Sequence, residues 1–205
     1  GQVSVPLKFG IMVETSEILD CLKDVLHFVD FVSIGMSDLR HFVLNEKRGK
    51  NQRPYDMTVH KFDPVMLLLI ACIEKETKLN AKKQIQVGVC GAISASDFDL
   101  AMLYYSMGIS SVTVNSSNYK IKNALVNLEL TPYKKFFENE LFSLPKVKKA
   151  LSFLGENISL ETPGLLNIIT KTYLSLREDE TKRIEFEKFM NEAGIEIQEG
   201  LASLS

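Results

Sequence analysis

Three short segments in the first half of the chain constrain its fold more than any other feature. Each has the pattern of a buried strand that ends in a polar or reactive residue. They are residues 10–14, 33–39 and 88–91. Because ligands collect at the C-terminal ends of strands in parallel α/β sheets, we expect Glu14, Asp38 and Cys90 to share one site. Two carboxylates and a thiol suggest a metal ion held beside a proton donor.

The sequence between and after these segments alternates between strand and helix patterns. Strands are expected at residues 9–14, 30–34, 85–89 and 111–115, and helices at about 16–28, 39–44, 64–78 and 97–107. Asp63 followed by Pro64 is a clear helix start, and the polar residues 45–61 before it are expected to form a long loop. This alternation predicts an α/β fold with a parallel sheet covered by helices.

The pattern changes after about residue 118, beyond which no convincing strand remains. Helices are expected over residues 133–154, 164–177 and 179–193, with Gly155 and Gly194 ending two of them. We therefore divide the chain into an α/β part, residues 1–127, and an α-helical C-terminal extension, residues 128–205.

Composition excludes several classes of protein. The chain has 205 residues, of which 45% are hydrophobic. Its formal net charge is -2, so it has no excess of basic residues that would indicate nucleic-acid binding. The longest apolar run, residues 65–73, is too short to span a bilayer, so no membrane insertion is expected. The three cysteines are scattered, which predicts reduced thiols in a cytoplasmic protein. Cys21 and Cys72 fall in apolar helical patterns and are expected to be core thiols.

In order and spacing, the three segments resemble the C-terminal barrel of phosphoenolpyruvate-utilising enzymes. The resemblance is strongest to the phosphoenolpyruvate–protein phosphotransferases, Enzyme I of the bacterial sugar phosphotransferase system. Arg48 and Gly49 lie at the family's distance from Asp38, and residues 108–115 correspond to its last barrel strand. The resemblance covers roughly residues 8–127 and none of the extension. It implies half of a TIM-like (β/α)8 barrel with parallel strands.

The resemblance also implies a role for each matching residue. Glu14 and Asp38 would bind the Mg²⁺ that holds phosphoenolpyruvate. Cys90 would be the general acid that protonates the enolate carbon, so that pyruvate forms as phosphate leaves. Arg48 would contact the phosphate, and Ser37 stands at the substrate-binding position where the family has Asn.

Departures from the family pattern give a second expectation. Ala92 replaces a Glu beside the cysteine and Ser16 replaces a Pro. By the resemblance, the chain would begin at the fifth of eight barrel strands, without the half that carries the phosphate-clamping arginines and without the phosphohistidine domain. Half a barrel leaves two exposed strand edges. We therefore expect a dimer or other homo-oligomer, a complementary half-barrel chain, or an edge covered by the extension.

Two functions follow from these observations. The first is a phosphoenolpyruvate-binding phosphotransferase-type domain, Mg²⁺-dependent, with Cys90 as the acid, which is complete only when joined to a second half. The alternative is a catalytically inactive, enzyme-derived interaction or regulatory protein. Plainer interpretations of the residues also stay open. Glu14 and Asp38 could act as helix caps, Cys90 as an inert buried thiol, and Arg48 as part of a solvated charged run.

Overall fold

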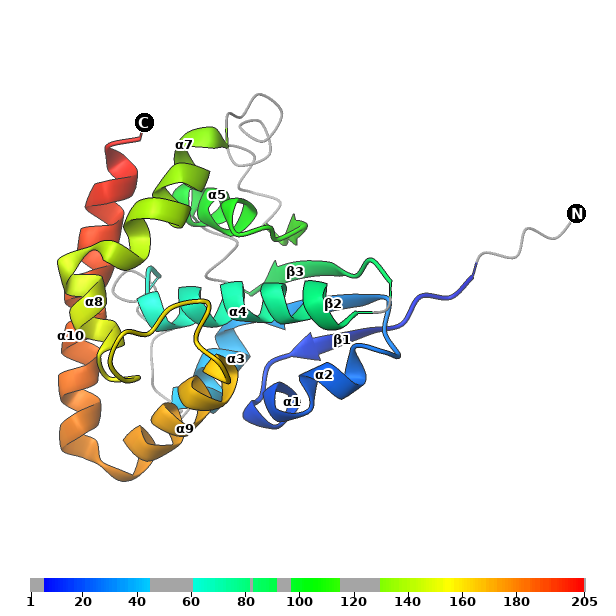
Figure 1. The fold of residues 1–205 in the computed structure, drawn as a ribbon, viewed down its shortest axis with the longest axis horizontal. Coiled ribbons are helices and arrows are strands. Elements are labelled where there is room, and N and C mark those ends of the chain that lie inside the picture. The colour runs from blue at the N-terminus through cyan, green and yellow to red at the C-terminus, as the bar shows by residue number, and fades with distance from the viewer. Residues whose placement is uncertain (1–5, 45–60, 82, 92–96, 115–129, 205) are drawn as a thin grey trace, which may run out of the picture.

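The computed structural model describes residues 6–44, 61–81, 83–91, 97–114 and 130–204 (Figure 1). Within them, four parallel strands form one sheet in the order β1-β2-β3-β4. They are β1 (Gly10–Val13), β2 (Phe31–Gly35), β3 (Gln86–Cys90) and β4 (Ser111–Val112). Each strand pairs with the next one along the chain, as in part of a TIM-like barrel. The predicted α/β class with a parallel sheet is confirmed.

Strand register divides the side chains between two faces of the sheet. Val13, Ile34 and Val89 are buried against the helices, at 0%, 0% and 1% exposure. The alternate residues form the other face, which we call the open face. The register aligns its residues in rows across neighbouring strands. One row contains Met12, Ser33, Gly88 and Ser111, and the next contains Gly35 and Cys90. One face of the sheet therefore makes the core, and the other carries the predicted reactive residues.

The helices of the α/β part follow the predicted order with shifted boundaries. They are α1 (Ser16–Asp20), α2 (Leu22–Val25), α3 (Met36–Leu44), α4 (Pro64–Asn80) and α5 (Phe98–Ser106). The single helix expected over residues 16–28 is broken at Cys21, and α3 begins three residues before the expected residue 39. The Asp63 carboxylate accepts hydrogen bonds from the backbone N–H groups of Val65 and Met66 at 2.9 and 3.1 Å. It caps α4 as predicted.

The extension is helical, but its elements differ from those expected. It contains α7 (Thr131–Lys135), a π-helical turn (Phe136–Glu140), a 3-10 turn (Leu141–Ser143), α8 (Pro145–Leu151), α9 (Leu165–Glu178) and α10 (Glu180–Ala202). The continuous helix predicted over residues 133–154 is wrong, because Pro145 has no N–H to continue one and instead begins α8.

Gly194 does not end a helix, and that prediction is also wrong. Helix α10 runs through it to Ala202. A Cβ at Gly194 would lie 3.4 Å from the backbone oxygen of Phe62, just before α4. The glycine therefore permits close packing of α10 on the start of α4 rather than a change of chain direction.

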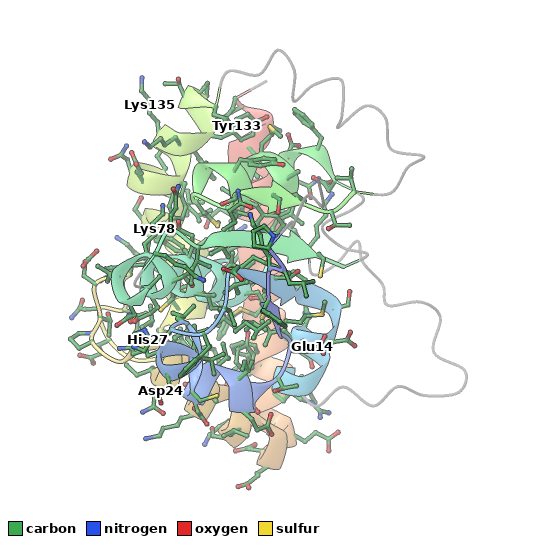
Figure 2. All side chains as sticks on the ribbon, turned by 90° about the vertical axis from the view of Figure 1, so that its right-hand side faces the viewer. Glu14, Asp24, His27, Lys78, Tyr133 and Lys135 are labelled. Atoms are coloured by element: carbon green, nitrogen blue, oxygen red, sulfur yellow. The ribbon has the colours of Figure 1, made fainter. Side chains whose placement is uncertain are left out.

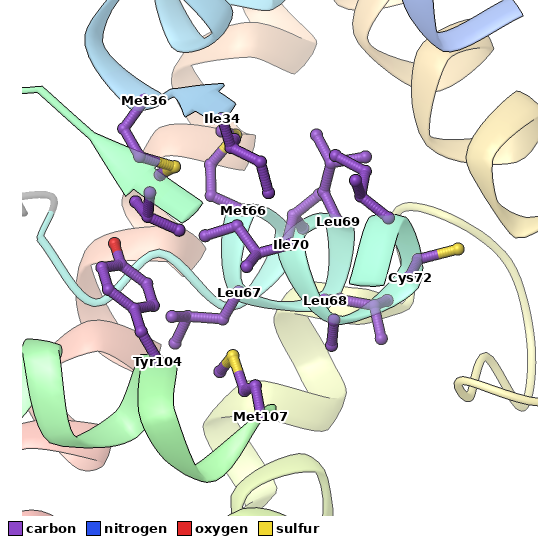
Figure 3. Packing of buried hydrophobic residues seen from close by; sticks show 14 of the residues in the cluster. Ile34, Met36, Met66, Leu67, Leu68, Leu69, Ile70, Cys72, Tyr104 and Met107 are labelled. Atoms are coloured by element: carbon purple, nitrogen blue, oxygen red, sulfur yellow. The ribbon is translucent and has the colours of Figure 1, made fainter. Parts of the chain in front are cut away.

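Helix α4 is the centre of the structure (Figure 1). Every residue from Pro64 to Ile73 is buried. One side of α4 faces Ile34 of the sheet, while Tyr104 and Met107 approach from another (Figure 3). Helices α8, α9 and α10 of the extension also contact it. Because α4 is buried on all sides, its long apolar run packs inside the protein. In the described part of the chain, no helix combines the length and apolarity needed to cross a bilayer.

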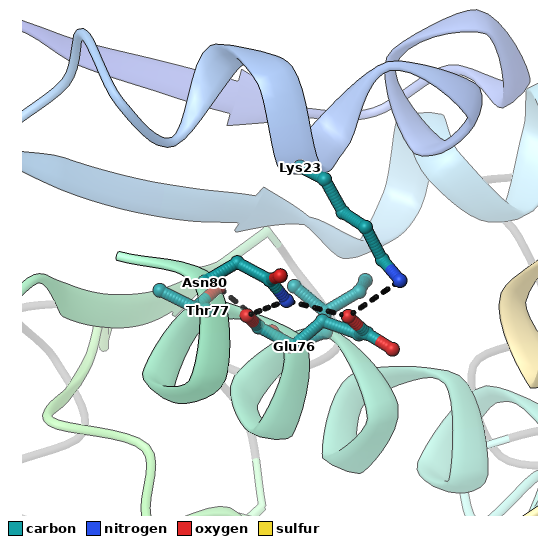
Figure 4. A network of polar contacts seen from close by, with 5 residues as sticks. Lys23, Glu76, Thr77 and Asn80 are labelled. Carbon is teal, nitrogen blue, oxygen red and sulfur yellow. Dashed lines mark hydrogen bonds and ion pairs between the residues drawn. The ribbon is translucent and has the colours of Figure 1, made fainter. Parts of the chain in front are cut away.

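A polar cluster joins α2 to the C-terminal half of α4 (Figure 4). The Lys23 ammonium lies 3.3 Å from the Glu76 carboxylate, which also accepts a hydrogen bond from the Asn80 side-chain amide at 2.8 Å. These groups lie on the outer surface, where ion pairs contribute little to stability. They fix the orientation of Glu76 rather than forming a site.

Candidate functional site at the carboxyl edge of the sheet

The strand register brings the predicted residues to one edge of the sheet. Val13 pairs with Ile34, and Gly35 pairs with Cys90. Glu14 follows Val13 directly and therefore lies at the level of Gly35 and Cys90. Figure 2 shows Glu14 near helix α3, which begins where β2 ends. The prediction that Glu14 and Cys90 reach the same carboxyl edge is consistent with this register.

Glu14 lies directly over Gly35. A Cβ placed on Gly35 would be 3.2 Å from both the Cβ and the Oε2 atom of Glu14, and 3.4 Å from the Met12 sulfur. Only glycine leaves the carboxylate this close to the β2 backbone without displacing it. Glu14 does not cap α1, because Thr15 occupies the cap position.

Ser37 lies against the turn that follows β3. A Cβ on Gly91 would be 3.0 Å from the Ser37 Oγ atom and 3.3 Å from its backbone nitrogen. Gly91 also has φ +117°, a conformation that side chains other than glycine rarely adopt. The backbone conformation and the close approach of Ser37 therefore both require glycine at position 91. Ser37 can lie close to β3, which carries Cys90, because Gly91 has no side chain.

Asp38 lies in the first turn of α3 and is half-buried. Because α3 begins at Met36, the alternative in which Asp38 caps a helix starting at Leu39 is wrong. A carboxylate in a first turn is still favoured by the partial positive charge of the helix N-terminus. Asp38 therefore lies on α3, which follows β2 directly at the same edge of the sheet as Glu14.

Cys90 has a neighbour that sequence reasoning missed. The Ser33 hydroxyl lies 3.4 Å from the Cys90 sulfur, within hydrogen-bonding range for sulfur. Both residues are half-buried, whereas Cys72 is 4% exposed and burial raises the pKa of its thiol to about 11. The period of two in β2 could have identified Ser33, since it shares a face with Gly35.

Two ion pairs at the N-terminal ends of α4 and α5 were also missed. The Arg40 guanidinium lies 3.8 Å from the Asp63 carboxylate, and these residues are 3% and 2% exposed. Lys61 forms an ion pair with Asp97, which caps α5. Helices of a βα unit begin where its strands end, so these pairs lie at the carboxyl edge of the sheet. One pair joins the middle of α3 to the cap of α4, and the other joins the residues before α4 to the cap of α5.

Not every predicted residue can be placed. Arg48, and also Ala92, lie outside the described residues. Among the residues that the structure does describe, no group of three or more His, Cys, Asp or Glu side chains is positioned to hold a metal ion. The donor chemistry of Glu14 and Asp38 nonetheless fits Mg²⁺, which binds one or two carboxylates and completes its shell with water and substrate phosphate.

A cavity of about 550 Å³ opens at the opposite end of the sheet. It lies between the C-terminal half of α4 and the starts of β3 and β4, and its lining includes Glu74, Lys78, Lys83 and Ser110. In Figure 2, Lys78 and Glu14 appear on different sides of the sheet. The cavity therefore does not coincide with the predicted site, although its lysines could attract an anion.

Comparison with known proteins shows to which family the sequence belongs. Residues 1–130 match the family model described as PEP-utilising enzyme, PEP-binding domain. A phosphoenolpyruvate-protein phosphotransferase of Buchnera aphidicola from Acyrthosiphon pisum is 26% identical over 149 residues, 72% of this chain and 25% of that protein. One from Streptomyces coelicolor is 30% identical over 113 residues, 54% of this chain and 19% of that protein.

A third relative carries a different name. A probable phosphoenolpyruvate synthase of Archaeoglobus fulgidus is 29% identical over 110 residues, 53% of this chain and 14% of that protein. The chain thus matches a quarter or less of the length of these relatives. The family model covers more than half of the chain and includes Glu14, Ser37, Asp38 and Cys90. The chain belongs to the family of PEP-utilising enzymes, through their PEP-binding domain.

Proposed function

We propose that residues 1–127 bind phosphoenolpyruvate together with Mg²⁺ at the carboxyl edge of the sheet, as part of a phosphotransferase-type enzyme. Glu14 and Asp38 would bind the metal ion, Ser37 the substrate and Arg48 its phosphate. The observation that carries the proposal is the convergence of Glu14 on Gly35 and of Ser37 on Gly91, beside Cys90. Family membership supports phosphoenolpyruvate as the ligand.

The proposed chemistry divides between phosphoryl transfer and protonation. Bound Mg²⁺ would neutralise charge on the transferring phosphoryl group. As the phosphorus–oxygen bond breaks toward an acceptor nucleophile, the remaining enolate takes a proton on its methylene carbon from the Cys90 thiol, which gives pyruvate and a thiolate. Solvent then reprotonates the thiolate. The Ser33 hydroxyl, 3.4 Å from the sulfur, would hold the thiol in position and stabilise the thiolate by a hydrogen bond.

We propose that turnover also requires a phosphoryl acceptor and further phosphate-binding groups. The chain matches a quarter or less of the length of these related enzymes. We propose that residues 128–205 form a separate helical extension that supports α4. The scattered thiols suit a cytoplasmic protein.

Calorimetric titration of phosphoenolpyruvate with and without Mg²⁺ tests the proposal. We expect saturable, Mg²⁺-dependent binding that Glu14→Gln and Asp38→Asn abolish. Asp30→Asn, which removes a carboxylate before β2 at the other end of the sheet, should leave it unchanged. If none of the proteins binds the ligand, with or without a complementary half-barrel, the chain is instead an enzyme-derived interaction or regulatory protein.

A further inference from the structure

A buried ion pair links α3, the helix that carries Ser37 and Asp38, to the start of α4. The Arg40 guanidinium lies 3.8 Å from the Asp63 carboxylate, and both side chains are almost fully buried. Taking two charges out of water is costly, so replacing such a pair with apolar side chains is often neutral or even stabilising. Stability is therefore a poor explanation for the presence of this pair.

The cap of α4 does not need the charge on Asp63. Its Oδ1 atom accepts the hydrogen bonds from the backbone N–H groups of Val65 and Met66. A serine hydroxyl caps helices about as well as an aspartate carboxylate does. The Oδ2 atom takes no part in these two bonds and is the atom that pairs with Arg40. The negative charge of Asp63 thus serves Arg40 rather than the cap.

The surroundings of the pair are buried and largely apolar. Figure 3 shows Tyr104 of α5 beside α4, within the packing of this helix. Tyr104 is 0% exposed, and burial raises the pKa of its hydroxyl, on which the charges of Asp97, Arg40 and Asp63 also act. Opposite charges attract more strongly in such a medium than in water. The attraction between Arg40 and Asp63 is therefore strong, and it has a definite direction.

Apolar packing by itself determines the orientation of α3 less sharply. This helix contacts β2, α1 and α9, and its buried residues include Met36 and Leu39. Such contacts are not directional, so they tolerate small rotations and shifts. Ser37 and Asp38 lie half-buried in the first turn, where the Ser37 hydroxyl lies against Gly91. A small rotation of α3 would move both residues relative to β3.

We infer that Arg40 and Asp63 are positioning residues, whose buried charge pair fixes α3 so that Ser37 and Asp38 stand beside Cys90. The pair acts through these residues rather than by touching a ligand. Its contribution is to the geometry of the site and not to the stability of the fold. The inference rests on the proposed function in one respect, that displacing Asp38 weakens Mg²⁺-dependent binding of phosphoenolpyruvate.

The neighbouring ion pair supplies a matched control. Lys61 pairs with the Oδ2 atom of Asp97, while the Oδ1 atom accepts a hydrogen bond from the Leu100 backbone and caps α5. This pair has the same chemistry as the first one. It joins the residues before α4 to α5 and does not include α3. Its removal should disturb the same edge of the sheet without releasing α3.

The decisive variant removes the charge pair and keeps the helix cap, by Arg40→Met together with Asp63→Ser. The control combines Lys61→Met with Asp97→Ser. In calorimetric titration with phosphoenolpyruvate and Mg²⁺, we expect the Arg40/Asp63 double variant to lose affinity roughly tenfold, as when the support of a metal ligand is removed. The control should bind as the wild type does. Arg40→Lys keeps the positive charge and should bind more tightly than the double variant.

A measurement without ligand separates this inference from the proposed function. Gly91 lies on a different element from Arg40 but touches Ser37, so its amide chemical shift reports the position of the first turn of α3. In the ligand-free protein, we expect this signal to move in the Arg40/Asp63 double variant and to stay in place in the control. If the wild type binds no phosphoenolpyruvate but Gly91 responds in this way, the proposed ligand is refuted and the positioning role stands.

Urea unfolding completes the test, with an expected midpoint for the Arg40/Asp63 double variant at least as high as that of the wild type. A lower midpoint, or a double variant that does not fold, would make the pair a stabilising element and overturn the inference. An unmoved Gly91 amide, or wild-type affinity in the double variant, would show that the pair does not position α3. Equal effects in the control would mean general damage to this edge of the sheet, which would also refute the inference.

Discussion

The Glu14 carboxylate is held against a glycine: its Oε2 atom lies 3.2 Å from the point that a Cβ on Gly35 would occupy. Replacing Gly35 with Ala should therefore shift Glu14 by a few tenths of an ångström without removing any polar group. We expect the Mg²⁺-dependent affinity for phosphoenolpyruvate to fall roughly tenfold, as when a supporting group of a metal ligand is disturbed. Calorimetry would measure the change.

Gly10→Ala is the matched control for this variant. It crowds the Phe31 ring on the same face of the sheet, and the three atoms nearest to its Cβ all belong to that ring rather than to Glu14. Equal loss of affinity in the two variants would mean that the effect comes from general damage to the sheet rather than from Glu14.

Gly91→Ala should lower the free energy of unfolding by about 1–3 kcal/mol, because its φ of +117° strains any side chain and its Cβ would press on Ser37. Gly164→Ala is the comparison, since Gly164 has φ +68° with open space around it. Urea unfolding of both variants measures the difference. A cost at Gly164 as large as that at Gly91 would argue against close contact with Ser37.

The extension should contribute strongly to stability through Phe186. This side chain is 1% exposed, and its ring centroid lies 5.5 Å from those of both Phe153 and Tyr173 in edge-on geometry. Phe186→Ala should cost about 3–5 kcal/mol, as expected for a buried aromatic residue. Ile184→Ala, two residues away and 60% exposed, should change stability by less than about 0.5 kcal/mol. Similar chemical-denaturation midpoints for the two variants would contradict this packing.

Asp30 should make stability depend on pH in the acid range. Hydrogen bonds from Lys83 and from the Phe9 backbone hold the pKa of Asp30 below its ordinary value of 3.8. Because the folded-state pKa is the lower one, the stabilisation is present above pH 3.8 and is lost as pH falls through the folded-state value. Urea midpoints measured across this range should fall less steeply in Asp30→Asn. An unchanged slope would show that Asp30 is not the responsible group.

The three thiols should differ in reactivity toward iodoacetamide. Cys21 is half-buried, so the expectation that it is a core thiol is wrong, and it should be alkylated together with the half-buried Cys90 in the native protein at about pH 8. Cys72, with a pKa of about 11, should react only after unfolding. Ser33→Ala should slow alkylation of Cys90 about threefold by removing one hydrogen bond to sulfur, and leave Cys21 unaffected. Mass spectrometry of the peptides reads out each site. Equal rates at Cys90 with and without Ser33 would remove its proposed positioning role.

The α/β part could be predicted where local rules determine the structure. Asp63 before Pro64 caps α4 because both preferences act within one turn, and the strand ends follow from apolar patterns bounded by Glu14 and Cys90. The contact between Ser33 and Cys90 could not be predicted from such local rules. It depends on the register between β2 and β3, which are 57 residues apart at this contact.

The extension shows the other limit of sequence reasoning. Glycine is common just after the end of a helix, and Gly194 was predicted to end one. It lies instead inside α10, where the lack of a side chain lets the Phe62 backbone approach. The pair of Arg40 and Asp63 is likewise tertiary, since it joins α3 to the cap of α4. Such contacts override local propensity and become visible only when the elements are packed.

The most direct test of the account is to map phosphoenolpyruvate with Mg²⁺ onto the protein by amide chemical shifts. We predict that the perturbed amides cluster at Glu14, Gly35, Ser37, Asp38 and Cys90, and that Glu14→Gln removes these changes. Perturbations confined instead to the cavity at Lys78, Lys83 and Ser110 would contradict the account, because the ligand would then bind at the opposite end of the sheet.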